Sequence, residues 1–228
     1  SEISQKLKSI TCFYLDRNGF LWMGTNGYGI LKYDSRISLF KNLNVGSMYF
    51  MNTNRSDELI YVEFASRKFR SMALNTDKST IRNIVPEKIC DPNWYIGDAT
   101  NIIEDNDGNY WTLIASNKLN DAINKSNCLL KYDTSNDKIY KYVESEVRNG
   151  YEYRRLFLDN DNQIWISATA SDQSRKLLKF NKQTGKIETI ETFSGETHFA
   201  NYPFLSAAVQ VPSGTMWFGT VRGLYSYN

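Results

Sequence analysis

Apolar and polar residues alternate along this chain in short runs, and Gly, Asn, Asp or Ser interrupts them about every eight to twelve residues. An apolar spacing of two is typical of strands with one buried face, and the interrupting residues favour tight turns. No stretch has the spacing of a long amphipathic helix. Near the N-terminus the pattern predicts four short strands, at Ile10 to Leu15, Phe20 to Gly24, Ile30 to Tyr33 and Ile37 to Leu43.

One segment, Asp16 to Asp34, is repeated along the chain. It combines a turn, a strand centred on Trp22, a Gly-rich loop and a second strand. The same order returns around three later tryptophans, Trp111, Trp165 and Trp217. The residue three before each Trp is Gly or Asn, as a tight hairpin with positive φ requires. Tyr61 is expected to take the place of Trp in a weaker copy, which gives a period of about 45 to 50 residues, typical of a propeller.

The repeat therefore predicts an all-β fold, a β-propeller of about five four-stranded antiparallel blades. The predicted blades are residues 1–44, 45–90, 91–145, 146–195 and 196–228, in a single propeller module. The last blade stops after its third strand. We expect an arc, or part of a larger propeller, rather than a ring in which Ser1 to Lys8 supplies the missing outer strand beside Gly223 to Tyr227.

The four repeated tryptophans are expected to be largely buried. A large aromatic side chain on the second strand fills the wedge between adjacent blades, and its indole N–H should find a backbone acceptor. Two of the three cysteines, Cys12 and Cys128, lie in predicted strands, where a buried small hydrophobic role is expected. The odd cysteine count and its spacing predict neither a disulfide framework nor a metal site.

Composition indicates a globular protein that is able to bury a core. Of 228 residues, 41% are hydrophobic and 14% aromatic, and the net charge of +2 comes from 27 basic and 25 acidic residues without a basic block. Nucleic acid is therefore not an expected partner. There is no apolar run of about 18 residues, no signal peptide and no initiating Met. We expect a piece excised from a longer protein, without direct membrane contact.

Motifs for catalysis or metal binding are nearly absent. His198 is the only histidine, which argues against His-based metal sites and triads. The run Asp105 to Asn109 imitates the start of a calcium loop, but position twelve is Ser116 where a bidentate Glu is required. Because the first copy has a turn in the same place, the run is interpreted as a hairpin. The sequence predicts no enzyme activity, no metal and no cofactor.

The repeated motif resembles the two-component regulator propeller repeat. The resemblance rests on D-x-x-G, then W-hydrophobic-G-T, a Gly-rich loop and a closing Y-D. The matching residues of the first copy are Asp16, Gly19, Trp22, Gly24, Thr25, Gly29, Tyr33 and Asp34, and those of the last copy are Gly214, Trp217, Gly219, Thr220, Gly223 and Tyr227. The copies at Trp111 and Trp165 match in part.

The resemblance implies a role in signal transduction. Such repeats form the extracytoplasmic sensor of hybrid histidine kinases, commonly for breakdown products of polysaccharides. It implies a periplasmic, non-enzymatic propeller that senses a carbohydrate and controls polysaccharide-utilisation genes. Histidine kinase activity would lie elsewhere in the parent protein. The expected partners are an oligosaccharide and the remainder of the parent chain, and homodimerisation is left open.

The segments that enter each first strand carry the candidate ligand-binding residues. These segments should lie on the face opposite the Asp-x-x-Gly hairpins, together with the long loop from Ser116 to Asn127. Aromatic faces stack on sugar rings, and amide and guanidinium groups hydrogen-bond hydroxyls. The candidates are Trp94, Tyr95, Tyr151, Tyr153, Arg154, His198, Asn201 and Tyr202.

Alternatives stay open at this point. The same aromatics also suit a packing role in the central channel and between blades. A propeller that acts as a protein-interaction scaffold, without a small ligand, is the second functional hypothesis. A propeller lyase or hydrolase is the third, and it would need paired carboxylates facing one another.

Overall fold

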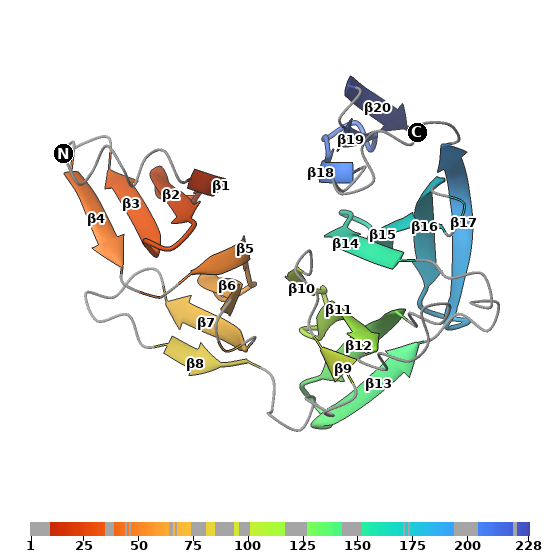
Figure 1. The fold of residues 1–228 in the computed structure, drawn as a ribbon, viewed down its shortest axis with the longest axis horizontal. Coiled ribbons are helices and arrows are strands. Elements are labelled where there is room, and N and C mark those ends of the chain that lie inside the picture. Colours follow the sequence, from red (N-terminus) through yellow and green to blue (C-terminus); the bar gives the residue numbers. More distant parts are fainter. Residues whose placement is uncertain are drawn as a thin grey trace. The chain divides into compact units, whose positions relative to one another are not determined.

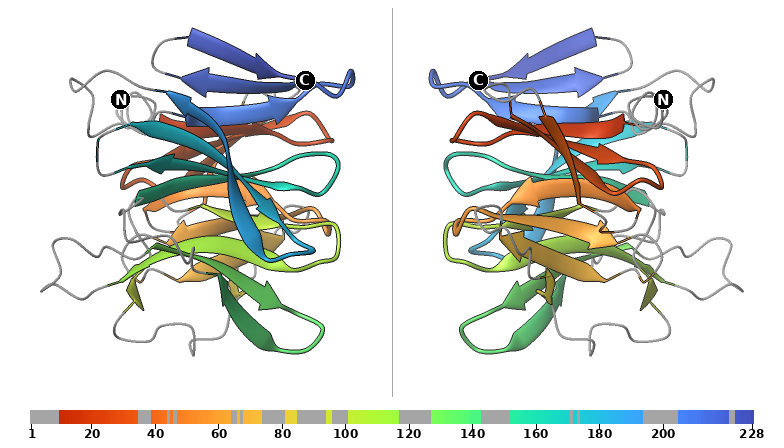
Figure 2. Two further views of the ribbon diagram at one scale, coloured as in Figure 1. Left: turned by 90° about the vertical axis from the view of Figure 1, so that its right-hand side faces the viewer. Right: turned by 90° about the vertical axis from the view of Figure 1, so that its left-hand side faces the viewer.

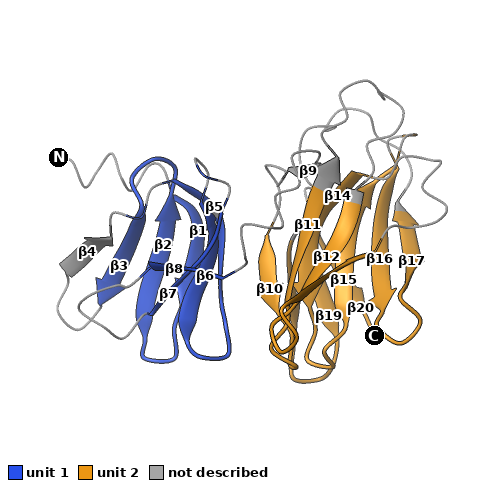
Figure 3. Cartoon of the chain, turned by 90° about the horizontal axis from the view of Figure 1, so that it is seen from below, with its two compact units in different colours: residues 1–89 blue, residues 90–228 orange. Residues whose placement is uncertain are grey.

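The chain folds as an all-β propeller with five antiparallel sheets, which we number as blades one to five (Figure 1). The structure is a computed structural model. It describes residues 10–34, 39–43, 45, 47–63, 66, 68–73, 81–84, 94–95, 101–116, 127–142, 152–170, 172, 174–193, 205–220 and 223–228, none of which is helical. In these ranges no helix has the length and apolar character that a membrane span needs. The chain separates into two compact units, residues 1–89 and 90–228 (Figure 3).

The first unit contains two four-stranded sheets. Blade one consists of β1 (Ile10–Leu15), β2 (Phe20–Thr25), β3 (Ile30–Asp34) and β4 (Leu39–Leu43). Blade two consists of β5 (Met48–Thr53), β6 (Glu58–Glu63), β7 (Phe69–Ala73) and β8 (Ile81–Asn83). In both blades each strand pairs with the next one along the chain. Figure 2 gives two further views of the strands.

The second unit contains three sheets with the same order of strands. Blade three consists of β10 (Ile102–Glu104), β11 (Tyr110–Ser116), β12 (Asn127–Asp133) and β13 (Lys138–Tyr142), and β9 (Trp94–Tyr95) also pairs with β11. Blade four consists of β14 (Glu152–Leu158), β15 (Ile164–Thr169), β16 (Arg175–Asn181) and β17 (Lys186–Phe193). Blade five consists of β18 (Leu205–Gln210), β19 (Met216–Thr220) and β20 (Gly223–Tyr227). Blade five has three described strands, whereas Ser1 to Lys8 lie outside the described residues, so the open arc stays a prediction.

The same tight hairpin joins the first and second strands of every blade. Its fourth residue has positive φ, a conformation that favours Gly and tolerates Asn and Asp. These residues are Gly19 (80°), Asp57 (55°), Gly108 (80°), Asn162 (62°) and Gly214 (90°). The expected role of Gly or Asn in the turn is confirmed.

The hairpin also corrects the alignment of blade two. Because the tryptophan follows the positive-φ residue by three positions, Ile60 is the equivalent residue after Asp57. The expectation that Tyr61 takes this place is therefore wrong by one residue, and a shift of one moves a strand side chain to the other face. Tyr61 instead packs in the cluster that covers Trp22.

A buried aspartate at the start of the hairpin fixes three of the tryptophans. In blade one, the Oδ1 atom of Asp16 accepts hydrogen bonds from the Asn18 and Phe20 amides, and Oδ2 accepts one of 2.8 Å from Trp22 Nε1. Asp105 and Asp159 receive the indole N–H of Trp111 and Trp165 in the same way, both at 2.7 Å. The predicted backbone acceptor is thus wrong, since the acceptor is a carboxylate six residues earlier.

Trp217 departs from the other three tryptophans. Trp22, Trp111 and Trp165 are 1–2% exposed, whereas Trp217 is 37% exposed. Its hairpin begins with Val211, which offers no carboxylate to the indole. Residues of the following blade cover Trp111 and Trp165, and no strand follows blade five among the described residues. The prediction that all four are buried is therefore wrong for Trp217.

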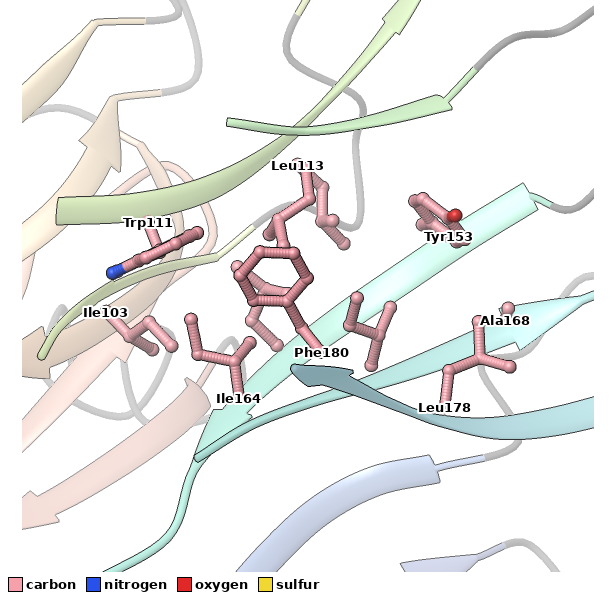
Figure 4. Close-up of a cluster of buried hydrophobic side chains, with 11 residues drawn as sticks. Ile103, Trp111, Leu113, Tyr153, Ile164, Ala168, Leu178 and Phe180 are labelled. Carbon is pink, nitrogen blue, oxygen red and sulfur yellow. The ribbon is translucent and has the colours of Figure 1, made fainter. Parts of the chain in front are cut away.

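The core of the second unit lies between its blades. Between blades three and four, Trp111, Ile164 and Phe180 belong to one cluster of buried side chains, and Figure 4 shows Trp111 at one end of it and Tyr153 at the other. The rings of Trp111 and Phe180 are 5.3 Å apart. Between blades four and five, Trp165 packs on Phe218 with ring centroids 5.8 Å apart. Burial of aromatic side chains at each of these contacts stabilises the stack of blades.

Amide side chains add hydrogen bonds from blade to blade in this unit. Asn101 donates to the Leu156 carbonyl and accepts from the Leu156 amide, both at 2.8 Å, so it joins blade three to the first strand of blade four. The Asn162 side chain accepts from the Asn106 amide at 2.9 Å and links two hairpins. These bonds fix the alignment of adjacent first strands, which carry the candidate site.

Candidate functional site

The candidate site lies at the start of the first strands, the end opposite the hairpins. Here β14 begins, β15 ends and β16 begins, and in Figure 3 this end of the second unit is the upper one. The pairing of Glu152 with Thr169 and of Thr169 with Arg175 places these three residues in one row across the sheet. We call this the entering end of blade four, defined by residues 152–155, 167–169 and 175.

A β-bulge interrupts the first strand near the entering end in blades one, two, four and five. In blade four, Arg154 and Arg155 lie opposite Ser167, because the register shifts between Tyr153 and Arg155. The same shift places Thr11 and Cys12 opposite Gly24, and Ser206 and Ala207 opposite Gly219. A bulge turns side chains away from the regular strand direction, and bulges are frequent beside functional sites.

The bulge explains the glycine of the repeated W-hydrophobic-G-T motif in blade one. A Cβ atom at Gly24 would lie 2.6 Å from Cys12 Sγ, which is closer than real Cβ contacts. Cys12 is half-buried rather than buried as expected, whereas Cys128 is completely buried. Burial raises the pKa of the Cys128 thiol to about 12, so this thiol is not a nucleophile near neutral pH.

Charged side chains gather at the entering end of blade four. Arg154 Nη2 donates to Glu152 Oε2 at 2.7 Å, and the side chains are 22% and 42% exposed. Arg175 is only 9% exposed. Burial lowers the pKa of the Arg175 guanidinium, the charge of Arg154 lowers it further, and Glu152 acts in the opposite direction. The three side chains therefore interact electrostatically.

The predicted site residues have different surroundings. Tyr153 is 6% exposed and belongs to the cluster between blades three and four, so it packs in the core rather than facing solvent (Figure 4). Arg154 is half-buried and paired with Glu152. Trp94 and Tyr95 form β9 and pair with Ser116 and Ala115 at the end of β11.

The register places β9 and the start of β14 at the same end of their blades. Trp94 and Tyr95 lie beside the end of β11, as Glu152 lies beside the end of β15. Thus Trp94, Tyr95 and Arg154 share the entering end of the second unit. The remaining candidates, Tyr151, His198, Asn201 and Tyr202, lie outside the described residues, as does most of the long loop from Ser116 to Asn127.

The structure adds residues that the candidate set did not contain. Glu152 pairs with Arg154, and Arg175 comes from a different strand. Ser167 is 3% exposed, and its hydroxyl has no hydrogen-bond partner. The sequence signal for Arg175 was its place at the start of the third strand, level with the start of the first.

The described side chains at this end are suited to the recognition of hydrogen-bond acceptors. Guanidinium groups donate hydrogen bonds and do not accept them, so they recognise acceptor groups such as carboxylates and hydroxyls. No three His, Cys, Asp or Glu side chains come together as a metal site in the described ranges. The calcium-like run beginning at Asp105 is a hairpin whose carboxylate already accepts from Trp111 Nε1, from backbone amides and from Lys182 Nζ.

Comparison with protein families identifies the repeat. The model of the two component regulator propeller family matches residues 4–27. The first blade carries a two-component regulator propeller repeat. The match includes the hairpin from Asp16 to Gly19 and the strand with Trp22. No curated protein sequence matches the chain.

Solved structures share the fold of the whole chain. Two structures of the extracellular domain of BT4673 from B. thetaiotaomicron, described as a putative one component and a putative hybrid two component system, are 20% identical with TM-scores of 0.62 and 0.63. The match covers 96% of this chain and 26% of theirs, so the chain spans about a quarter of their length. A virginiamycin B lyase from Staphylococcus aureus is 16% identical with a TM-score of 0.59, over 96% of this chain and 70% of the lyase. The extracellular domain of a regulatory system and an enzyme thus share this fold, and fold alone does not assign the activity.

Proposed function

We propose that this chain is a non-enzymatic, ligand-sensing propeller of a membrane-bound hybrid two-component regulator. The observation that carries the proposal is the two component regulator propeller repeat at residues 4–27 in a chain with the fold of the BT4673 extracellular domains. The propeller would lie outside the cytoplasm, in the periplasm. It would pass a change in domain contacts to the remainder of the parent chain.

The proposed ligand is an oligosaccharide, and its binding would control transcription of polysaccharide-utilisation genes. The proposed site is the entering end of the second unit, with Trp94, Tyr95 and Arg154 and with Tyr151, His198, Asn201 and Tyr202 from the segments that precede the first strands. Arg154 is half-buried, so part of its guanidinium donors can reach a ligand. Tyr153 would support the site from the core rather than touch the sugar.

The test is a thermal-shift and calorimetry screen of the intact sensor region against oligosaccharides from neutral and acidic polysaccharides. A ligand at about a hundred times its Kd should stabilise the fold by roughly 2.7 kcal/mol. Trp94→Ala should weaken binding of that ligand, while Arg17→Ala in the exposed hairpin of blade one should leave it unchanged. Binding that is unaffected by Trp94→Ala and by Arg154→Ala would place the site elsewhere.

One observation favours the second hypothesis, a protein-interaction scaffold. Blade five exposes apolar side chains on its described strands, with Val209 60% and Leu224 71% exposed beside Trp217. An apolar surface of this kind suits a contact with another protein segment. A screen in which no oligosaccharide binds, together with loss of assembly in Leu224→Asp, would favour the scaffold over the sensor.

A further inference from the structure

The entering end of blade four differs from the equivalent ends of blades one, two and five. The bulge holds Thr11 and Cys12 in blade one, Tyr49 and Phe50 in blade two, and Ser206 and Ala207 in blade five, but it holds two arginines in blade four. Since the same register shift occurs in all four blades, the arginines are not needed to form the bulge. A structural requirement for the bulge therefore does not account for them.

Positive charge exceeds negative charge around this bulge. Residues 152–155 and 172–176 contribute Arg154, Arg155, Arg175 and Lys176 against the carboxylates of Glu152 and Asp172. Asp172 accepts from the Ser174 amide in its own loop at 2.8 Å, whereas Glu152 pairs with Arg154. Holding like charges close together in a partly buried place opposes folding.

The hydrogen-bonding groups of the site are mainly donors. Arg154, Arg155, Arg175 and the buried Ser167 hydroxyl lie at neighbouring positions of the three strands, and Glu152, which pairs with Arg154, is the one carboxylate among residues 152–155, 167–169 and 175. Arg155 and Arg175 also make other interactions, so Arg154 is the group that a ligand would reach first. A donor-rich site of positive charge selects an acceptor-rich ligand of negative charge.

We propose that the entering end of blade four binds the anionic group of an acidic sugar, and that this group displaces Glu152 from Arg154. The shared chemistry is a carboxylate or a sulfate ester, each of which accepts two parallel hydrogen bonds from a guanidinium. Glu152 occupies the anion position when no ligand is bound. Arg175 contributes positive charge from within the blade and does not contact the ligand directly, because its side chain is almost completely buried.

This inference rests on the proposed sensor function, and it predicts which class of sugar binds. The experiment is isothermal titration of the intact sensor region with three probes of equal length: an oligogalacturonate, a sulfated galactan oligosaccharide and the neutral galactan oligosaccharide. We expect an anionic probe to bind at least about tenfold more tightly than the neutral one, as for hydrogen bonds to charged groups. Raised salt should reduce this preference.

Two variants test the displacement in opposite directions. Arg154→Ala should weaken binding of the anionic probe roughly tenfold and leave binding of the neutral probe nearly unchanged. Arg154→Lys should bind the anionic probe with an affinity between those of the native protein and Arg154→Ala, because it keeps the charge and loses the planar guanidinium. Glu152→Gln should strengthen anionic binding several-fold, since it removes the competing carboxylate. Arg82→Ala is the matched control, because Arg82 pairs with Glu58 in the other unit.

The outcomes separate this inference from the function on which it rests. Equal binding of neutral and anionic probes, or anionic binding unchanged in Arg154→Ala, would overturn the inference and leave the sensor function standing. Weaker anionic binding in Glu152→Gln would overturn the displacement. Absence of binding by all three probes would count against both the anionic site and the oligosaccharide sensor. A preference for the carboxylate or the sulfate probe identifies the source of the anion.

Discussion

The two ends of the blades in the second unit are built differently. At the hairpin end, each carboxylate of Asp105 and Asp159 accepts an indole N–H and two backbone amides within its own turn. At the entering end, the chain carries a bulge, an arginine pair and a carboxylate that is 42% exposed. The hairpin end satisfies its polar groups internally, whereas the entering end carries the partly exposed guanidinium donors of the proposed site. Under the proposed function, stability and recognition are assigned to opposite ends of the same strands.

The largest effect on stability should come from replacing a buried tryptophan whose indole N–H donates to the hairpin aspartate. Trp165→Ala removes a side chain that is 1% exposed and leaves the Asp159 carboxylate without its indole donor. We expect a loss of about 3 to 5 kcal/mol in unfolding free energy. Trp217→Ala, at the equivalent place but 37% exposed, should lose less than about 2 kcal/mol. Urea unfolding of both variants measures the difference. Equal losses of unfolding free energy would show that the burial of Trp165 and its hydrogen bond to Asp159 add no stability beyond that of the exposed Trp217.

The Asp105 carboxylate should give the second largest effect. Burial raises its pKa, but hydrogen bonds from Trp111 and Asn109 and the charge of Lys182 outweigh burial, so the folded pKa lies below the usual range. Its stabilisation is complete above the ordinary carboxyl pKa of about 4 and is lost as the pH falls through the lower folded value. Asp105→Asn should remove this contribution at neutral pH, by about 1.5 to 3 kcal/mol.

The measurement for Asp105 is unfolding free energy from pH 7 down to pH 3, in the native protein and in Asp105→Asn. The difference between the two proteins should shrink as the pH falls below about 4. A difference that is constant over the whole range would contradict the role of the charge. Leu224→Ser, at an exposed position of blade five, serves as the control that should show no such pH dependence.

The smallest effect on stability should come from the entering end. Arg154 and Glu152 form a partly exposed pair, and such pairs contribute up to about 1 kcal/mol. Arg154→Ala should therefore change the unfolding free energy by less than about 1 kcal/mol while it weakens binding of the anionic probe. A loss of about 3 kcal/mol or more in urea unfolding would make the pair a structural element and remove the contrast between the two ends.

Short-range features of the fold were predictable from the sequence. The Gly or Asn three residues before each tryptophan specified the hairpin, and the period specified five blades. Two predictions failed for different reasons. Tyr61 was misplaced by one residue because the positive-φ residue of this turn is Asp57 rather than Gly or Asn, so the end of the turn could not be recognised from the glycine pattern. Trp217 was expected to be buried because the last copy keeps Gly214 and the W-hydrophobic-G-T part of the motif, yet burial depends on a covering blade and on a carboxylate where Val211 stands.

The candidate site was predictable only in part. The order of strands predicted that the candidate residues lie at the entering end, and Arg154 lies there with the backbones of Trp94 and Tyr95. Tyr153 was grouped with the ligand-facing residues, because composition does not show which face of a bulged strand is buried. Arg175 is 23 residues from Glu152 in sequence, and only the register of three strands places them in one row.

Hydrogen–deuterium exchange with and without the anionic probe tests the central claim most directly, because it reports both ends of the blades in one experiment on the intact sensor region. The account predicts increased protection in peptides that cover residues 152–155 and 167–175. Peptides that cover the hairpins at 105–109 and 159–163 should exchange at the same rate with and without the probe. Protection at the hairpins, with no change at residues 152–155, would contradict the assignment of recognition to the entering end.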